Sequence, residues 1–327
     1  MPHWDYGRQG ADWTNIGQCG NTARQSPINV DDSKAMTMDK TFQYSYKPPA
    51  KVIFLNNGHT LEVKATGLIF GNLTFAGAEY VLEQLHFHAP TEHTFGGPTK
   101  HRELEMHLLH LNKEGAAAVV SVTFTSSGAT AAHPLLTFLG QKPLPESGAE
   151  VEVNVNFEQF DLNNLISDTD IFYNYKGSLT TPPCSETVEW FVMKDPLFAK
   201  KAQLDVWKSA LAYPGSNGNY REIQNSEGAS RNAQPLTKVT SRYVASGLLV
   251  SELPGNVSKS RYNMGWAAIV SLVAGIVVLM VLIIGVVVWC VNRNKDAEGE
   301  GAYMLQPNPR VPYVEQRASF PYQEEEE

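Results

Sequence analysis

The stretch QLHFHAP, residues 84–90, alternates along the chain and places His86 and His88 two residues apart. In a β-strand, successive side chains point to opposite faces, so the two imidazoles would share one face. Paired histidines also occur on solvated strand faces. This stretch alone therefore leaves two alternatives, a metal site and a polar strand face.

The stretch ELEMHLLHL, residues 103–111, favours the metal site. Its alternation places Glu103, Glu105 and His107 on one face, so a third imidazole on a second strand could meet the first two. Three neutral imidazoles leave the fourth position of tetrahedral zinc open, which is typical of a catalytic site. Gln84 and Glu105 each precede one of these histidines by two residues, where they could accept the outer ring N–H of a metal-bound imidazole.

The surrounding sequence predicts one β-rich domain over residues 1–250. Gly, Pro and Asn punctuate short β-type runs. These runs are KVIFLNN (51–57), LEVKA (61–65), VLEQLHFHA (81–89), ELEMHLLHL (103–111), AAVVSVTFT (117–125) and TVEWFVM (187–193). The best helical pattern spans 195–211, with a Pro in its first turn. We expect a mostly antiparallel sheet with peripheral helices and no internal repeat.

Composition excludes one class of partner. The chain has 327 residues, a formal net charge of −8 and 43% hydrophobic residues, enough for one large domain or two small ones. Nucleic-acid binding requires clustered Lys and Arg, and the sequence contains no such cluster. Nucleic acid is therefore not an expected partner.

Residues 265–289 predict a transmembrane helix. The stretch GWAAIVSLVAGIVVLMVLIIGVVVW has no charge, and at about 1.5 Å per residue it spans the roughly 30 Å hydrocarbon core. A polar linker, 251–264, precedes it. The tail, 290–327, ends in four glutamates and reads as disordered. Ala267, Ser271 and Gly275 form a stripe of small residues through which two such helices could dimerise.

Cysteines and sequons indicate the orientation, because basic residues flank the span equally, two on each side. Cys19 and Cys184 in the N-terminal domain suggest a disulfide formed in an oxidising compartment. Asn72 (NLT) and Asn256 (NVS) are N-glycosylation sequons on the same side. We expect a single-pass type I protein with an extracellular or lumenal domain, the plasma membrane being favoured. The start MPHWDYGRQG lacks an apolar segment, so the signal sequence was either removed or lies upstream.

Six blocks of the sequence, in order over roughly residues 3–248, resemble the signature blocks of α-class carbonic anhydrase. They are RQSPIN (24–29), NNGH (56–59), HFHAPTEH (86–93), ELEMHLLH (103–110), SLTTPPCSETVEW (178–190) and AQPL (233–236). The HAPTEH form is closer to bacterial, plant and protist members than to the cytosolic animal enzymes. The resemblance implies zinc-dependent, reversible hydration of carbon dioxide to bicarbonate and a proton.

The resemblance also implies roles for individual residues. His86, His88 and His107 match the three zinc ligands, and Gln84 and Glu105 match the partners of their rings. Further matches concern the nucleophile and the substrate. They are Thr180, which would hold the zinc-bound hydroxide; Glu92, which would accept the proton of that threonine; Thr181, beside bicarbonate; and Leu109, Val119, Leu179, Val188 and Trp190, the apolar wall for carbon dioxide.

Three matches concern proton transfer and structure. His59 matches the proton shuttle, Tyr6 a tyrosine that orders the solvent chain, and Arg231 a structural arginine. Glu62 stands where animal cytosolic enzymes carry asparagine, which could perturb the solvent network of the shuttle. His93 is expected to be a buried hydrogen-bonding residue.

Cys19 and Cys184 match a disulfide of secreted and membrane-bound members of this family. It would tether the N-terminal region beside TTPP and contribute roughly 4 to 5 kcal/mol in the chain-entropy model. Two rival functions remain: a catalytically silent binding or adhesion module, and a structural zinc domain. The silent module is disfavoured because all three histidines are present, and the structural site because no fourth ligand is evident.

Overall fold

The computed structural model describes residues 3–65, 70–141, 143–225, 232 and 234–244. The predicted linker, transmembrane span and tail (251–264, 265–289 and 290–327) lie outside these residues, as do Arg231 and the sequon at Asn256. Among the described residues, no helix is both long and apolar enough to cross a membrane.

The chain is built mainly of strands. They are β1 (Asn29–Val30), β2 (Met36–Tyr46), β3 (Lys51–Asn56), β4 (Leu61–Ala65), β5 (Gly71–Phe75), β6 (Ala78–His88), β7 (Thr94–Phe95), β8 (Leu104–Leu111), β9 (Ala117–Thr125), β10 (Glu150–Asn154), β11 (Ile171–Gly177), β12 (Val188–Met193), β13 (Leu197–Phe198) and β14 (Thr237–Tyr243). The helices are α1 (Pro134–Leu139), α2 (Lys201–Ala210) and the 3₁₀ turns η1 (Trp13–Asn15), η2 (Asp32–Lys34) and η3 (Leu162–Leu165).

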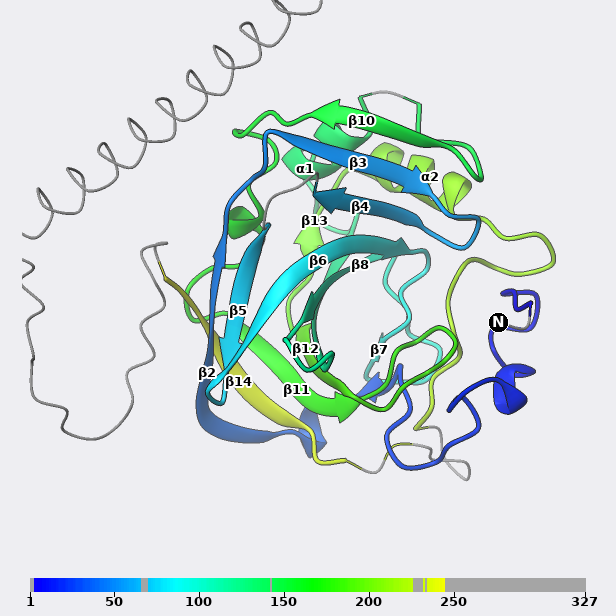
Figure 1. Ribbon diagram of the computed structural model, residues 1–327, viewed down its shortest axis with the longest axis vertical. Helices are drawn as coiled ribbons and strands as arrows, with labels where there is room; N and C mark the ends of the chain where they lie inside the picture. The colour runs from blue at the N-terminus through cyan, green and yellow to red at the C-terminus, as the bar shows by residue number, and fades with distance from the viewer. Residues whose placement is uncertain (1–2, 66–69, 142, 226–231, 233, 245–327) are drawn as a thin grey trace, which may run out of the picture. The chain divides into compact units, whose positions relative to one another are not determined.

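Twelve strands form one sheet, in the order β10-β3-β4-β6-β5-β2-β14-β11-β12-β9-β13, with β8 between β6 and β9. The 11-residue strand β6 pairs with β5 through its first part and with β4 through its last part. The pairings therefore return on themselves, from β8 through β6, β5, β2, β14, β11, β12 and β9 (Figure 1). Most pairs are antiparallel, as predicted; β2–β14, β9–β12 and β9–β13 are parallel.

Each of the six predicted runs forms a strand. LEVKA and AAVVSVTFT coincide with β4 and β9, and the others differ from β3, β6, β8 and β12 by no more than a few residues at their ends. Residue types that favour strands, bounded by Gly, Pro and Asn, identified these runs, although β9 is buried on both faces rather than on one. The pattern did not identify β2, β5, β10, β11 or β14.

The helix predicted over 195–211 is shorter than expected. Residues 201–210 form α2, but Leu197 and Phe198 form β13, paired in parallel with Phe124 and Thr125 of β9. Lys200 has extended backbone dihedrals, and the side chain of Gln203 caps its main-chain N–H. Pairing with the edge of β9 thus outweighs helix propensity in the first six residues.

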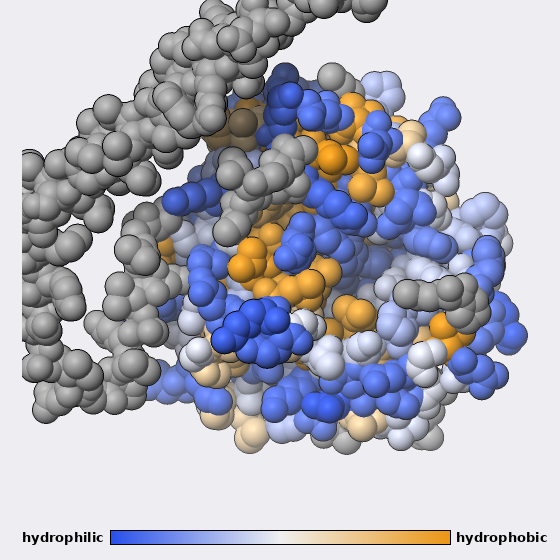
Figure 2. Space-filling model, viewed as in Figure 1, coloured by the Kyte–Doolittle hydropathy of each residue, from blue (hydrophilic) through white to orange (hydrophobic). Residues whose placement is uncertain are grey.

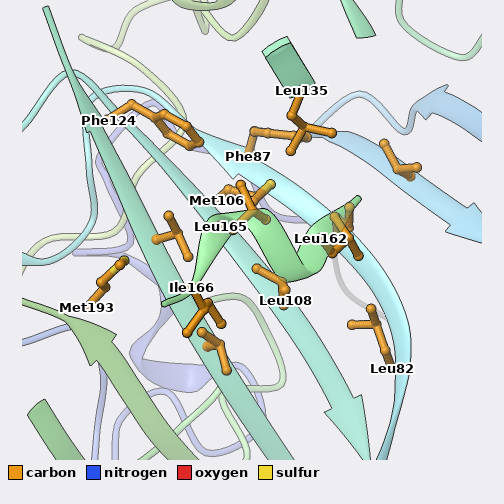
Figure 3. Close-up of a cluster of buried hydrophobic side chains, with 14 of the residues drawn as sticks. Leu82, Phe87, Met106, Leu108, Phe124, Leu135, Leu162, Leu165, Ile166 and Met193 are labelled. Carbon is orange, nitrogen blue, oxygen red and sulfur yellow. The ribbon is translucent and has the colours of Figure 1, made fainter. Parts of the chain in front are cut away.

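The central strands separate a hydrophobic core from a polar face. Phe87 of β6 packs in the core with Met106 and Leu108 of β8 (Figure 3), and Leu85 belongs to the same cluster. Leu162, Leu165 and Ile166 around η3 lie in the same cluster. Because side chains alternate, the residues between them in sequence face the opposite way. That opposite face, called the site face below, carries the histidines.

The helices lie at the periphery, with α1 and α2 at the end of the sheet where β10, β3 and β4 lie (top of Figure 1). On the face shown in Figure 2, hydrophilic residues predominate and hydrophobic residues appear in separate areas.

Candidate metal centre

Rows of directly paired residues cross the site face and place the candidate ligands side by side. His86 of β6 pairs with His107 of β8, which pairs with Ser121 of β9. Two residues before His86 in β6, Gln84 pairs with Leu109 of β8. Paired residues have Cβ atoms about 5 Å apart, so the antiparallel register itself brings the imidazoles together.

Three ring nitrogens converge. The Nε2 atom of His86 lies 3.1 Å from Nδ1 of His107. One nitrogen from each of His86, His88 and His107 lies within 4.8 Å of the others, so these residues could hold a metal ion. The Nε2 atom of His88 is buried and has no hydrogen-bond partner among the described residues. A buried polar atom without a partner is costly, and a metal ion at this point would satisfy it.

The other nitrogen of each ring is anchored by the protein. Nδ1 of His86 lies 2.9 Å from Oε1 of Gln84. Nε2 of His107 lies 2.8 Å from Oε1 of Glu105. Both contacts agree with the sequence prediction. Nδ1 of His88 lies 2.7 Å from the main-chain oxygen of Asn219, a partner that the sequence did not indicate.

Glu105 holds several parts of the site at once. Its Oε1 accepts hydrogen bonds from the rings of His93 (2.7 Å) and His107, and from the Ser121 hydroxyl (2.6 Å). Its Oε2 accepts the main-chain N–H groups of Glu92 (2.6 Å) and His93 (3.0 Å). His93, Glu105 and His107 also form a geometrically possible metal group. Because this carboxylate already accepts five hydrogen bonds, we assign it to positioning the ligands.

Burial shapes the ionisation of the site. Burial, with the neighbouring imidazoles, lowers the pKa of His86 well below its ordinary value. Burial also lowers the pKa of His88 to about 4 and lowers the pKa of His107. Burial opposes the charge of Glu105, but His93 and His107 outweigh it and hold the pKa of this carboxyl well below its usual range. The three candidate ligands are therefore neutral at pH 7, the form that binds metal.

Thr180 and Glu92 lie at the same site. Both are buried, at 4% and 0% exposure. Oε1 of Glu92 accepts the main-chain N–H of Arg221 (2.9 Å), and Oε2 lies 3.5 Å from Nε2 of His88. Burial raises the pKa of Glu92 to about 7, while nearby His107, the Thr180 side chain and the Arg221 amide lower it.

The residues expected to form an apolar wall lie in one hydrophobic cluster, separate from the main core. Val119, Val188 and Trp190 are buried in it. Leu109 and Leu179 are partly buried and pack against it. Val119 pairs directly with both Leu109 and Trp190. The wall thus continues the row that begins at Gln84, beside the histidines. Thr181 is partly buried in the loop that follows Thr180.

The ring of His59 stacks on Trp4, with centroids 3.9 Å apart. Its Nδ1 is buried and has no hydrogen-bond partner among the described residues. Burial, with His3 nearby, lowers the pKa of this imidazole. The ring of Tyr6 lies 6.4 Å from that of His59, and the Tyr6 hydroxyl is likewise buried without a partner in the described part of the chain. The main-chain oxygen of His59 accepts a hydrogen bond from Asn219 (3.1 Å).

The arginine that supports the site is Arg221. It is 1% exposed, and its guanidinium donates to Gln25, to the main-chain oxygen of Ser26 and to that of Cys19. Arg231, the predicted structural arginine, lies outside the described residues. The sequence prediction missed Arg221 and Asn219 because both lie in an irregular loop, where no periodic pattern indicates direction.

The predicted disulfide is present, joining Cys19 to Cys184 across 165 residues. Cys184 follows the TTPP turn, and its main-chain N–H donates to Thr181. The sequon residue Asn72 lies in β5, where its side-chain amide donates to Glu79. His93 is buried between Glu105 and the Tyr175 hydroxyl (2.8 Å), as expected.

A family model described as eukaryotic-type carbonic anhydrase matches residues 8–243. A carbonic anhydrase of Klebsiella pneumoniae is 35% identical over 228 residues, covering 68% of this chain and 87% of its own. Alpha carbonic anhydrase 8 of Arabidopsis thaliana is 32% identical over 223 residues, covering 67% and 54%.

Two solved structures are also similar. The α-carbonic anhydrase of Thermovibrio ammonificans, in complex with the inhibitor sulfanilamide, has a TM-score of 0.62 and 29% identity, covering 72% of this chain and 99% of its own. Dioscorin complexed with ascorbate has a TM-score of 0.61 and 26% identity, covering 74% and 99%.

Proposed function

The chain belongs to the eukaryotic-type carbonic anhydrase family and is a carbonic anhydrase, and on this premise we propose that it hydrates carbon dioxide at a zinc ion held by His86, His88 and His107, on the non-cytosolic face of a membrane. The observation that carries the zinc site is the convergence of three imidazole nitrogens. Each ring is anchored through its other nitrogen.

The donor set fits zinc. Three neutral imidazole ligands leave one open position, as in catalytic zinc sites. Nε2 of His88, which has no hydrogen-bond partner among the described residues, would gain a partner in the ion. Bound there, zinc supplies a Lewis acid that lowers the pKa of a water molecule to about 7. Gln84, Glu105 and the Asn219 carbonyl fix the tautomer of each ring, so that the remaining nitrogen presents a lone pair.

Thr180 and Glu92 select and orient the nucleophile. If the Thr180 hydroxyl donates a hydrogen bond to the nearby Glu92 carboxylate, the threonine oxygen is left as an acceptor. A nucleophile that presents an O–H is then held in a single orientation. Fixed orientation of this kind supplies much of the rate enhancement in reactions between two small molecules.

The apolar wall binds the uncharged substrate. Val119, Val188 and Trp190 offer carbon dioxide a surface with no hydrogen-bonding demand, next to the histidine row. Thr181 is partly exposed and can donate a hydrogen bond to bicarbonate. Bicarbonate is charged and gains nothing from an apolar surface, which favours its departure from the wall.

His59 exports the proton. Its ordinary pKa is near 6.5, and its ring stands against Trp4 and Tyr6. An imidazole of this kind can take a proton from the site and release it to buffer at working pH. The Tyr6 hydroxyl has no hydrogen-bond partner among the described residues, so it could order solvent between the histidine row and His59.

The location rests on the sequence and the disulfide. A disulfide between Cys19 and Cys184 is typical of oxidising compartments, which supports a domain outside the cytosol. The uncharged stretch 265–289 would anchor it to the lipid bilayer, and its stripe of small residues could pair two copies. Protease protection of intact cells tests the orientation: an accessible N-terminal domain with a protected tail is expected.

The activity test separates this function from a silent binding module. The full chain, purified in mild detergent, should hydrate carbon dioxide in stopped-flow assays and contain about one zinc per chain by elemental analysis. A chelator or a sulfonamide should abolish the rate. A folded chain that takes up zinc but shows no sulfonamide-sensitive hydration would falsify the enzyme function and favour the binding module.

A further inference from the structure

Glu62 is a buried carboxylate on the site face that none of the roles above uses. It is 7% exposed and pairs across strands with His86 (β4 lies alongside β6 in Figure 1). Its neighbours along β4, Leu61 and Val63, are fully buried in the main core. Because side chains alternate, Glu62 points to the opposite face, where the histidines lie. The carboxylate therefore lies beside a proposed zinc ligand.

Two partners hold this carboxylate in place. Oε1 lies 2.7 Å from Nζ of Lys64, and Oε2 accepts a hydrogen bond from Nδ2 of Asn57 (3.2 Å). Asn57 Oδ1 in turn accepts the main-chain N–H groups of His59 and Thr60. Glu62 is thus fixed between the histidine row and the turn that carries His59. The Lys64 side chain is 49% exposed, so the cation of the pair faces solvent while the anion is buried.

The two charges of the Glu62–Lys64 pair differ in burial and in the rows of residues that they join. The row through Glu62 continues with His86, His107 and Ser121, and the row through Lys64 continues with Gln84 and apolar residues. Among the residues of β4, β6, β8 and β9 in these two rows, Glu62 and Lys64 are the charged side chains; in the other direction, across Leu55 and Ile53 of β3, the rows reach the exposed Glu150 and Glu152 of β10. A buried charge acts over a longer range than a solvated one, because water screens it less. The carboxylate therefore contributes more to the potential at the site than its partner does.

We propose that the Glu62–Lys64 pair sets the affinity of the site for anions. Glu62 opposes the binding of bicarbonate and other monovalent anions, and Lys64 moderates that opposition. The inference rests on the proposed zinc site and adds to it a selectivity for the neutral substrate over charged ligands. At an effective dielectric constant of about 20, a bare like charge at an assumed distance of about 8 Å weakens anion affinity about thirtyfold, and the neighbouring Lys64 cation reduces this effect.

The experiment measures anion affinity directly. The full chain is loaded with cobalt in place of zinc and titrated with azide and with bicarbonate, and binding is followed by the visible spectrum of the metal. Relative to the unaltered chain, Glu62→Gln should bind both anions about three- to tenfold more tightly. Lys64→Gln should bind them more weakly. Both changes should shrink as salt is added.

Two controls isolate the charge at this position. Glu83→Gln removes the same charge from an exposed residue of β6 and should leave anion affinity unchanged. Imidazole, neutral at pH 8.5, should bind the Glu62→Gln variant and the unaltered chain equally. Equal azide affinity in the Glu62→Gln variant and the unaltered chain would overturn the inference while leaving the proposed zinc site intact. A change equal for azide and imidazole would also overturn it, because it would indicate altered geometry. Failure of the unaltered chain to take up cobalt would instead count against the proposed metal site.

Discussion

The main-chain oxygen of Asn219 lies 2.7 Å from Nδ1 of His88, although 131 residues separate them in sequence. The side chain of Asn219 makes this contact possible. Its Oδ1 accepts the N–H of Ala89, and its Nδ2 donates to the main-chain oxygens of Phe87 and His59. One buried residue therefore fixes a proposed zinc ligand to the end of β6 and to the turn of the proposed proton shuttle.

Replacing Asn219 by Ala should weaken zinc binding and stability together. Three side-chain hydrogen bonds are lost at a 1%-exposed position, so the free energy of unfolding should fall by about 2 to 4 kcal/mol. Zinc affinity should fall on the order of tenfold, because the main-chain oxygen that holds the His88 ring is no longer anchored by the Asn219 side chain. Denaturation and competition with a chromophoric chelator measure the two effects. Asn164→Ala, at an exposed site, is the control, and equal zinc affinity in both variants would contradict the prediction.

Replacing Glu105 by Gln should reduce zinc affinity more than replacing its neighbour Glu103. Glu105 is buried, and one of its carboxylate oxygens accepts hydrogen bonds from the imidazole rings of His93 and His107. An amide oxygen carries no full charge, so the ring of His107 becomes a weaker ligand, and affinity should fall about 10- to 100-fold. Glu103 bonds to Ser126 and Lys208 at the start of β8. Glu103→Gln should lower stability slightly and leave zinc affinity unchanged in chelator competition.

The two-residue period of a β-strand predicted which way the side chains of the regular strands face. In β6 and β8 this period assigned His86, His88 and His107 to one face, and the strand register then placed them side by side. The contacts of Gln84 and Glu105 followed from the same rule. These residues could be found from sequence because a strand fixes the direction of every side chain along it.

Periodicity could not predict what depends on loops. Asn219 and Arg221 act through backbone groups and a folded-back chain, to which alternation does not apply. The start of α2 was misplaced for a related reason. Leu197 and Phe198 have helix-compatible neighbours, but an open edge of β9 offered them hydrogen bonds. Such long-range pairings are not encoded in a local pattern.

Loss of the disulfide should destabilise the domain. Opening a loop closed across 165 residues should lower the free energy of unfolding by up to about 5 kcal/mol in the chain-entropy model. Cys19→Ser with Cys184→Ser should therefore unfold at lower urea, and reductant should shift only the unaltered chain. Mass spectrometry of unreduced peptides checks the pairing first. Free thiols at both positions would exclude the bond, and coincident urea curves would show that it contributes nothing.

Replacing His59 by Ala should slow proton export without changing the interconversion at the metal. Hydration in weak buffer should fall on the order of ten- to a hundredfold, because no imidazole carries the proton to solvent. Imidazole buffer should restore the rate. Isotope exchange between carbon dioxide and bicarbonate at equilibrium requires no net proton release. Its rate should therefore be the same in the variant and in the unaltered chain. A hydration rate that does not change in weak buffer would remove His59 from this role.

His110 should make the domain sensitive to acid independently of the metal. It is fully buried in the core, with Nε2 3.2 Å from the Tyr46 hydroxyl and Nδ1 3.1 Å from the Ala118 oxygen. Burial lowers its pKa to about 4, whereas in the unfolded chain it is near 6.5. Between these values the unfolded state binds more protons, so stability falls as pH drops from about 6.5 to about 4. Above pH 6.5 the group is neutral in both states and contributes no pH dependence.

Replacing His110 by Gln tests this effect, because the amide can keep both hydrogen bonds but does not titrate. The unaltered chain should lose stability with a slope up to about 1.4 kcal/mol per pH unit steeper than the variant, and about 3 kcal/mol in total between pH 6.5 and 4. Urea denaturation at a series of pH values measures the difference. The proposed zinc ligands and His133, whose pKa burial lowers to about 4, titrate in both proteins and cancel. Parallel stability curves would show that His110 carries the same charge in the folded and unfolded chains.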